Sequence, residues 1–61
     1  MKKYYKYTMT ITTTENDSYP FDGYFVDHFE ADKFLTENEL EGNSIIIHSI
    51  TEVEMDSLPN L

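Results

Sequence analysis

The sequence predicts a small α+β domain, an antiparallel sheet with one helix, in the chain order β-β-α-β. Two stretches rich in Tyr, Thr and Ile, residues 2–14 and 43–55, have the composition of strands. Between them, a stretch with helical spacing begins after Asp27, a residue type that caps helices well. A shorter apolar stretch, residues 19–26, follows a turn-rich segment and completes the order.

The first strand is expected over residues 2–14, which contain no Gly or Pro. Side chains of a strand alternate between its two faces, so the odd-numbered positions share one face. That face is apolar and is predicted to point inward (Tyr5, Tyr7, Met9 and Ile11). The opposite face is polar and is predicted to meet solvent (Lys6, Thr8, Thr10 and Thr12).

Residues 14–20 cluster Glu, Asn, Asp, Ser and Pro, which is the composition of a turn. A hairpin therefore leads back into the second strand, which is expected over residues 19–26. Pro20 and Gly23 weaken that strand, because Pro lacks an N–H and Gly has no side chain to pack. We expect it to be short, irregular or at an edge of the sheet.

The helix is expected to run from about residue 28 to about residue 39 or 41. Asp27 is the predicted N-cap, and Glu30 stands three residues on, where a capping box has Glu or Gln. Asp32 adds negative charge early in the helix, where the helix dipole favours it. Gly42 is the predicted C′ residue, at which a helix ends in a left-handed conformation.

Phe29 and Phe34 stand five residues apart, so about 500° of helical rotation separates the two rings. Phe34 shares its side of the helix with three residues that are predicted to pack on the sheet (Ala31, Leu35 and Asn38). Phe29 and Leu40 are predicted on the opposite side, with acids on both flanks. Either Phe29 folds back onto the second strand near Tyr24 or Phe25, or it meets another chain, since exposed aromatic residues with a polar rim mark interfaces.

The last strand is expected over residues 43–55. Three consecutive isoleucines, residues 45–47, make both of its faces apolar near its start. Regular alternation predicts one face that stays apolar or small (Ile45, Ile47, Thr51, Val53 and Met55). The other face begins apolar and ends acidic (Ile46, His48, Ile50, Glu52 and Glu54). A tail of about residues 56–61 is expected to fray.

The 61 residues are expected to form a single domain, residues 1–61. A chain this short buries only about 60% of the surface that its unfolded form exposes. Because there is no cysteine for a disulfide, self-association is the main way to gain core, and we expect a homodimer. No apolar run reaches the ~20 residues of a membrane span, and no apolar segment follows the basic N-terminus, so we expect a protein that is not secreted.

The chain is strongly acidic, with 4 Lys and Arg against 12 Asp and Glu, a net charge of −8. All twelve acids and only one base lie from residue 15 onward, which gives that part −11. Such a surface repels nucleic acid and membranes and attracts basic surfaces at long range. It is either a solvated surface that serves solubility or a surface for a basic partner. Nine aromatic residues indicate that the chain folds, because acidic chains that stay unfolded are poor in aromatics.

We expect no catalytic, cofactor or metal site, and we expect that the protein is not an enzyme. A catalytic pair of carboxylates needs a pocket that shifts its pKa values, and a chain this small has little room for one. His28 and Asp32, at i and i+4, are too few ligands for a stable metal site. His48 is predicted to be a hydrogen-bonded, partly buried strand residue, and Ser44 and Ser49 belong to no visible triad.

As a pattern, the whole chain resembles the small uracil-DNA glycosylase inhibitors made by podophages of Bacillus, which are acidic, dimeric DNA mimics. YKYTMTI resembles the first strand of that family, ENDS its acidic turn, DGYFV its aromatic second strand and NSIIIHSITEV its isoleucine-rich last strand. The family's Phe-Glu pair corresponds best to Phe29 and Glu30, although Lys33 stands where the family has Tyr. A second register places the family's Phe on Phe34, and the sequence leaves both registers open.

The resemblance implies a phage-encoded inhibitor that binds uracil-DNA glycosylase in the host cytoplasm. That enzyme binds DNA with a basic groove and pushes an apolar side chain into the base stack, so its inhibitor must offer carboxylates and an apolar pocket. By the resemblance, Phe29 is a pocket residue and Glu30 meets the phosphate-binding groups. Further partner-binding candidates lie on the same helix (Asp27, Asp32, Lys33, Glu37 and Leu40).

Two other functions stay open. The charge fits equally well an acidic inhibitor of another host DNA-binding enzyme, such as a restriction or CRISPR nuclease. The third hypothesis is a small structural or interaction protein without mimicry.

Overall fold

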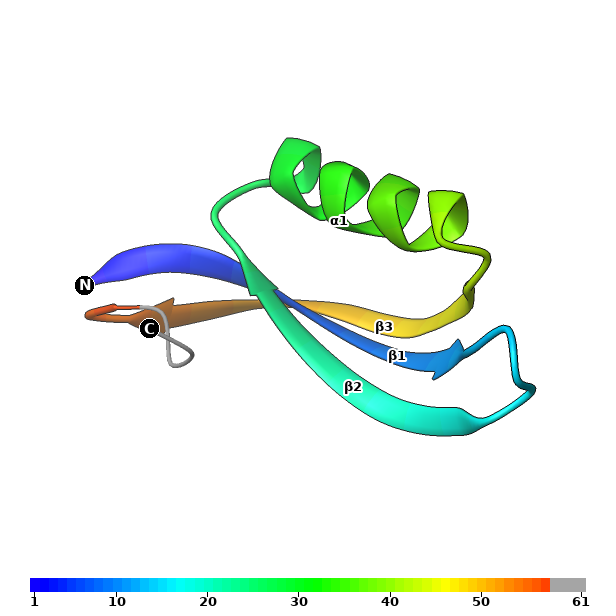
Figure 1. Cartoon of the computed structure of the whole chain (residues 1–61). Coiled ribbons are helices and arrows are strands. Elements are labelled where there is room, and N and C mark those ends of the chain that lie inside the picture. The colour runs from blue at the N-terminus through cyan, green and yellow to red at the C-terminus, as the bar shows by residue number, and fades with distance from the viewer. Residues whose placement is uncertain (58–61) are drawn as a thin grey trace.

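A computed structural model describes residues 1–57 of the chain (Figure 1). In chain order it contains β1 (Lys2–Thr12), β2 (Ser18–Phe25), α1 (His28–Leu40) and β3 (Ser44–Met55). The predicted α+β class and the order β-β-α-β are confirmed. A tail of about residues 56–61 was expected to fray, and residues 58–61 lie outside the described residues. β3 ends before that tail, at Met55.

The sheet has three strands in the spatial order β2-β1-β3, and both pairings are antiparallel. The first strand of the chain is therefore the central strand. Helix α1 lies over one face of the sheet, and the turn between β1 and β2 leaves the sheet at the same end as the connection from α1 to β3 (Figure 1).

The core lies between α1 and the covered face of β1. Met9 and Ile11 are almost fully buried, and Tyr7 and Ala31 are buried beside them. Partly buried apolar side chains complete this cluster (Tyr5, Phe25, Phe34, Leu35 and Ile45). The predicted inward face of the first strand is thus confirmed, with its first member only partly buried. Tyr4 is also buried, but it lies opposite Val53 on the other face, and the alternation pattern did not point to it.

The turn after β1 begins earlier than predicted, so the strand ends at Thr12 and not at residue 14. Thr13 closes the turn, because its N–H donates to the carbonyl oxygen of Asp17 at 2.8 Å and its own carbonyl accepts from Asn16 at 2.9 Å. Asn16 has φ 69°, a left-handed conformation that Asn tolerates better than most residues. β2 starts at once and lies at the edge of the sheet, as its proline predicts.

The N-terminus of α1 is capped as predicted. The carboxylate of Asp27 accepts a hydrogen bond from the backbone N–H of Glu30 at 2.9 Å, which satisfies one of the free amide groups of the first turn. The helix then runs within the predicted bounds, and Ala31 is its buried residue.

The C-terminus of α1 ends in a Schellman motif. Gly42, with φ 89°, donates its N–H to the carbonyl of Glu39 at 3.0 Å, and Asn43 donates its N–H to the carbonyl of Asn38 at 2.9 Å. A Cβ at Gly42 would lie 2.7 Å from the side chain of Thr14, so this glycine is needed for its φ angle and for close packing. The two turns at this end of the sheet therefore touch.

A β-bulge interrupts β3 at His48. Thr8 pairs with Ser49, whereas the next residue, Met9, pairs with Ile47, so His48 is the extra residue. Its imidazole Nε2 is hydrogen-bonded to the Thr10 hydroxyl at 2.7 Å. The predicted hydrogen bonding of His48 is confirmed, but its predicted partial burial is wrong, because the side chain is exposed on the uncovered face.

The alternation predicted for the last strand is wrong beyond the bulge, because one extra residue moves every later side chain to the opposite face. Cross-strand partners in an antiparallel pair share a face, so the register decides which residues face the helix. The register places five residues on the helix side (Ile45, Ile47, Ile50, Glu52 and Glu54). It places the others on the uncovered side (Ile46, Ser49, Thr51, Val53 and Met55).

Candidate partner-binding site

The ring of Phe29 projects from the helix into solvent, with 70% of the residue exposed. Phe34 takes the opposite orientation and stacks on Phe21, with ring centroids 5.5 Å apart, and it contacts Phe25 at the same centroid distance. The hypothesis that Phe29 folds back onto β2 is therefore wrong. The predicted division of the helix into a sheet-facing side and an exposed aromatic side is confirmed.

Phe29 lies at an open hollow on the outer face of α1, with a volume of about 400 Å³. Four further side chains line this hollow (Asp32, Lys33, Thr36 and Glu37). Three of them were predicted site residues, and the structure brings them together with Phe29. Thr36 was not among them, although it stands seven residues after Phe29, on the same side of the helix.

Carboxylates flank the ring of Phe29 on both sides of the helix. With 100° per residue, Glu30 and Glu37 share one flank of the helix, and Asp32 and Glu39 share the other. The two members of each pair are separated by a rise of about 10.5 Å along the helix axis. All four residues are exposed. The outer face of α1 therefore carries an aromatic ring between two rows of negative charge.

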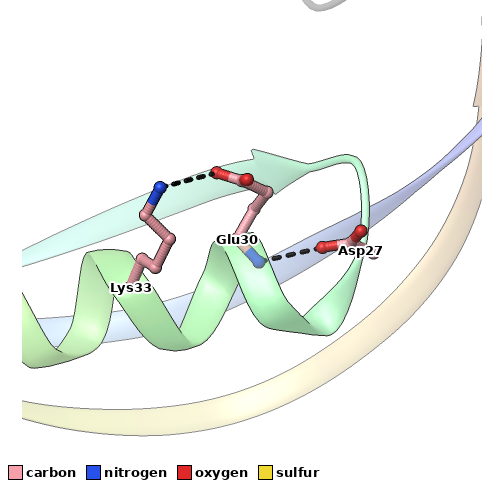
Figure 2. A network of polar contacts seen from close by, with 3 residues as sticks. All are labelled: Asp27, Glu30 and Lys33. Carbon is pink, nitrogen blue, oxygen red and sulfur yellow. Dashed lines mark hydrogen bonds and ion pairs between the residues drawn. The ribbon is translucent and has the colours of Figure 1, made fainter.

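Figure 2 shows how the first turn of α1 uses its polar groups. The Glu30 carboxylate lies 3.9 Å from the Lys33 ammonium, and about half of each side chain is exposed. An exposed ion pair of this kind adds little to stability, so it can open when a stronger partner arrives. The Asp27 carboxylate holds the backbone N–H of Glu30 and is already engaged by the fold.

Asp27 and Glu30 belong to a second hollow, of about 270 Å³, at the corner between β2 and α1. Its other lining residues are the last residues before the helix (Tyr24, Phe25 and Val26). Leu40 lines neither hollow and is 82% exposed, about 16 Å along the helix from Phe29. The predicted site residues thus belong to one helix and its N-cap. They line two separate hollows, except for Leu40, which lines neither.

His28 anchors the start of α1 to the central strand. Its Nδ1 is hydrogen-bonded to the Tyr7 hydroxyl at 2.5 Å, and the centroid of its ring lies 4.3 Å from the centroid of the Tyr5 ring. Burial raises the pKa of Tyr7, and the nearby Asp32 carboxylate raises it further. His28 is thus occupied in packing. Among residues 1–57, no group of three or more His, Asp or Glu side chains is placed to hold a metal ion.

Within the part of the chain that the structure describes, no helix is long and apolar enough to span a membrane. Comparisons of the chain with models of protein families, with curated proteins and with solved structures gave no match.

Proposed function

We propose that the chain is a DNA-mimic inhibitor that binds host uracil-DNA glycosylase and blocks its access to DNA. The observation that carries the proposal is the exposed ring of Phe29 in a hollow with carboxylates around it. Uracil-DNA glycosylase meets DNA with basic groups and also with an apolar side chain that enters the base stack. A surface that combines an apolar ring with carboxylates fits such an enzyme better than negative charge alone.

The distribution of charge supports an encounter through α1. Residues 27–41 contain six acids and one base, which gives −5 of the chain's −8. On the uncovered face of the sheet, Lys6 lies 3.8 Å from the carboxylate of Asp22, so part of the positive charge of β1 is neutralised there. A basic DNA-binding groove would be drawn toward the helix, and salt would slow this association.

Several residues of α1 and its N-cap have a role in this proposal. Phe29 contacts the apolar side chain that the enzyme would otherwise insert into DNA. The two rows of carboxylates stand in for phosphates (Glu30 and Glu37, Asp32 and Glu39). Asp27 keeps one oxygen on the helix N-terminus and contributes mainly charge. Leu40 adds a second exposed apolar side chain near the end of the helix.

A glycosylase assay on uracil-containing DNA tests this function. Purified protein in excess is expected to abolish uracil release at low ionic strength, and added salt is expected to slow the onset of inhibition. Full glycosylase activity in the presence of excess protein would contradict the proposal. Inhibition of a restriction or CRISPR nuclease, with no effect on the glycosylase, would favour the second hypothesis instead.

Lys33 offers a sharper test of the charge argument. Lys33→Gln removes the partner of Glu30 and makes the net charge −9, so association with the glycosylase is expected to be faster. Lys2→Gln is the matched control, because it changes the net charge equally on β1, where the register places Lys2 on the uncovered face of the sheet. Equal association rates for the two variants in stopped-flow experiments would argue against contact through this side of α1.

A further inference from the structure

The corner hollow, of about 270 Å³, lies between the end of β2 and the first turn of α1. Three apolar or aromatic residues and two acids line it (Tyr24, Phe25, Val26, Asp27 and Glu30). Sites for drug-sized molecules usually have a volume of about 300–1,000 Å³. The corner hollow is therefore better suited to a single side chain of another protein than to a cofactor.

The aromatic residues of the corner hollow are held by the core and still reach solvent. The ring centroid of Phe25 lies 5.4 Å from that of Tyr7 and 5.5 Å from that of Phe34, so core packing fixes its orientation. Tyr24 and Phe25 are half-buried, and Val26 is 55% exposed. The fold thus leaves an apolar surface open to solvent at this corner.

Two carboxylates share this corner, one from the N-cap and one from the first turn of α1 (Figure 2). Asp27 accepts the backbone N–H of Glu30 through Oδ1 at 2.9 Å. A carboxylate has about four lone-pair sites on its two oxygens, so Asp27 can accept further hydrogen bonds. Both residues are exposed. The corner hollow therefore joins an apolar surface to acceptors for a cation.

Two lysines of this chain lie near these residues but outside the corner hollow. The Lys33 ammonium lies 3.9 Å from the Glu30 carboxylate, and Lys33 lines the hollow on the outer face of α1 instead. The Lys6 ammonium lies 6.0 Å from the ring centroid of Tyr24 and 3.8 Å from the carboxylate of Asp22, which neutralises it. Among residues 1–57, which include all four lysines of the chain, no lysine lines the corner hollow.

We infer that the corner hollow binds an arginine side chain of a partner protein. The guanidinium stacks on the ring of Tyr24 and donates its N–H groups to the carboxylates of Asp27 and Glu30. Arginine fits better than lysine, because its planar guanidinium stacks on aromatic rings, presents several donors at once and is more weakly hydrated than an ammonium. An ammonium would lose more hydration on entering an apolar hollow.

The corner hollow adds a contact that the proposed function does not require. It assigns a binding role to Tyr24, a residue of β2 that lies outside the helix. Because Glu30 lines the corner hollow and contacts Lys33 of the other hollow, the two hollows adjoin, and one partner can enter both. The inference rests on the geometry of the corner hollow and holds for any partner that presents an arginine.

An NMR titration of the isotope-labelled chain with acetyl-arginine-amide tests the inference. The backbone amide signals of residues 24–27 and 30 are expected to shift and to saturate. Acetyl-lysine-amide is expected to bind about two- to fivefold more weakly. Equal affinities of the two amides, or shifts spread evenly over all carboxylates of α1, would overturn the inference. Because no glycosylase is present, the result is independent of the inhibition assay.

Matched variants separate the corner hollow from general negative charge. Tyr24→Leu is expected to weaken binding of acetyl-arginine-amide about two- to fivefold, as for the loss of one exposed cation–π contact, whereas Tyr24→Phe keeps the ring and binds like wild type. Glu30→Gln is expected to weaken binding. Glu15→Gln, in the turn at the other end of β2, removes the same charge without this effect.

Two results with these variants would contradict the inference. One is unchanged binding in a folded Tyr24→Leu, and the other is equal weakening by the two Gln variants. If Tyr24→Leu fails to fold, the comparison of the two amides on the wild-type chain still decides the question.

Discussion

Phe29 and Phe34 form a natural pair for one experiment, because both are phenylalanines on the same helix with opposite environments. Phe29→Ala removes a ring that is 70% exposed, and Ala is the better helix former by a few tenths of a kcal/mol. We expect the free energy of unfolding to change by less than about 1 kcal/mol. In the same variant, inhibition of the glycosylase is expected to be lost, because the apolar contact of the proposed site is gone.

Phe34→Ala is the matched control and is expected to behave in the opposite way. Full truncation of a buried Phe costs about 3–5 kcal/mol, and partial burial reduces this to about 2–3 kcal/mol here. The loss includes the contacts with Phe21 and Phe25, each with centroids 5.5 Å apart. A domain of 61 residues has only about 3–9 kcal/mol to lose, so this variant is expected to be partly unfolded at 37 °C.

Urea denaturation followed by circular dichroism measures both changes. With a slope of about 1 kcal/mol per M for a small domain, Phe34→Ala is expected to lower the midpoint by about 2–3 M, and Phe29→Ala by less than about 1 M. The same samples are then tested in the glycosylase assay. A large loss of stability in Phe29→Ala would refute the helix orientation. Full inhibition by a folded Phe29→Ala would refute the role of the ring in partner binding.

Three further outcomes follow from the caps and from the buried tyrosine. Asp27→Ala is expected to lower the free energy of unfolding by about 1 kcal/mol in urea titrations, whereas Asp27→Asn, which keeps a cap acceptor, changes it little. Gly42→Ala is expected to cost about 1–2 kcal/mol, because of its φ of 89° and the contact with Thr14. Adding Thr14→Ser, which removes the contacted methyl group, should recover only part of that loss. The folded-state pKa of Tyr7 lies above its ordinary value of 10.0, so its contribution is complete below pH 10 and is lost as the pH rises further. Tyr7→Phe is expected to have a lower free energy of unfolding than wild type at pH 7 in urea titrations, because the hydrogen bond to His28 is lost. As the pH rises above 10, the free energy of unfolding is expected to fall less in this variant than in wild type.

The elements and the caps could be predicted because they depend on neighbouring residues. Asp27 and Gly42 mark the ends of α1 by chemistry that acts over four or five residues, and the spacing of apolar residues places Phe29 outside and Phe34 inside. Through Pro20, the same local reasoning gave an edge position as one of three expectations for the weak strand, and β2 does lie at an edge. These features need no knowledge of which strands pair.

Most of the features that could not be predicted depend on pairing at long range. Nothing near His48 in the sequence announces a bulge, since the extra residue appears only when β3 is aligned with β1. The bulge in turn decides that Ile50, and not Thr51, faces the helix. The anchoring of His28 by Tyr7 joins residues 21 positions apart, so it too appears only in the folded chain. For the candidate site, sequence identified the helix but not its division into two hollows.

The central position of β1 has a consequence for how this protein is made. β1 leaves the ribosome before β2 and β3, and its pairing with β3 joins residues as distant as Lys2 and Met55, 53 positions apart (55 − 2 = 53). The β1–β2 hairpin can close early, but one side of β1 stays open until β3 has been synthesised. Closing such distant pairs is slow, so the pairing of β1 with β3 is expected to follow the closing of the hairpin. The newly made chain therefore passes through a stage in which its central strand has a free edge, and a brief contact with a chaperone at that stage would favour correct folding.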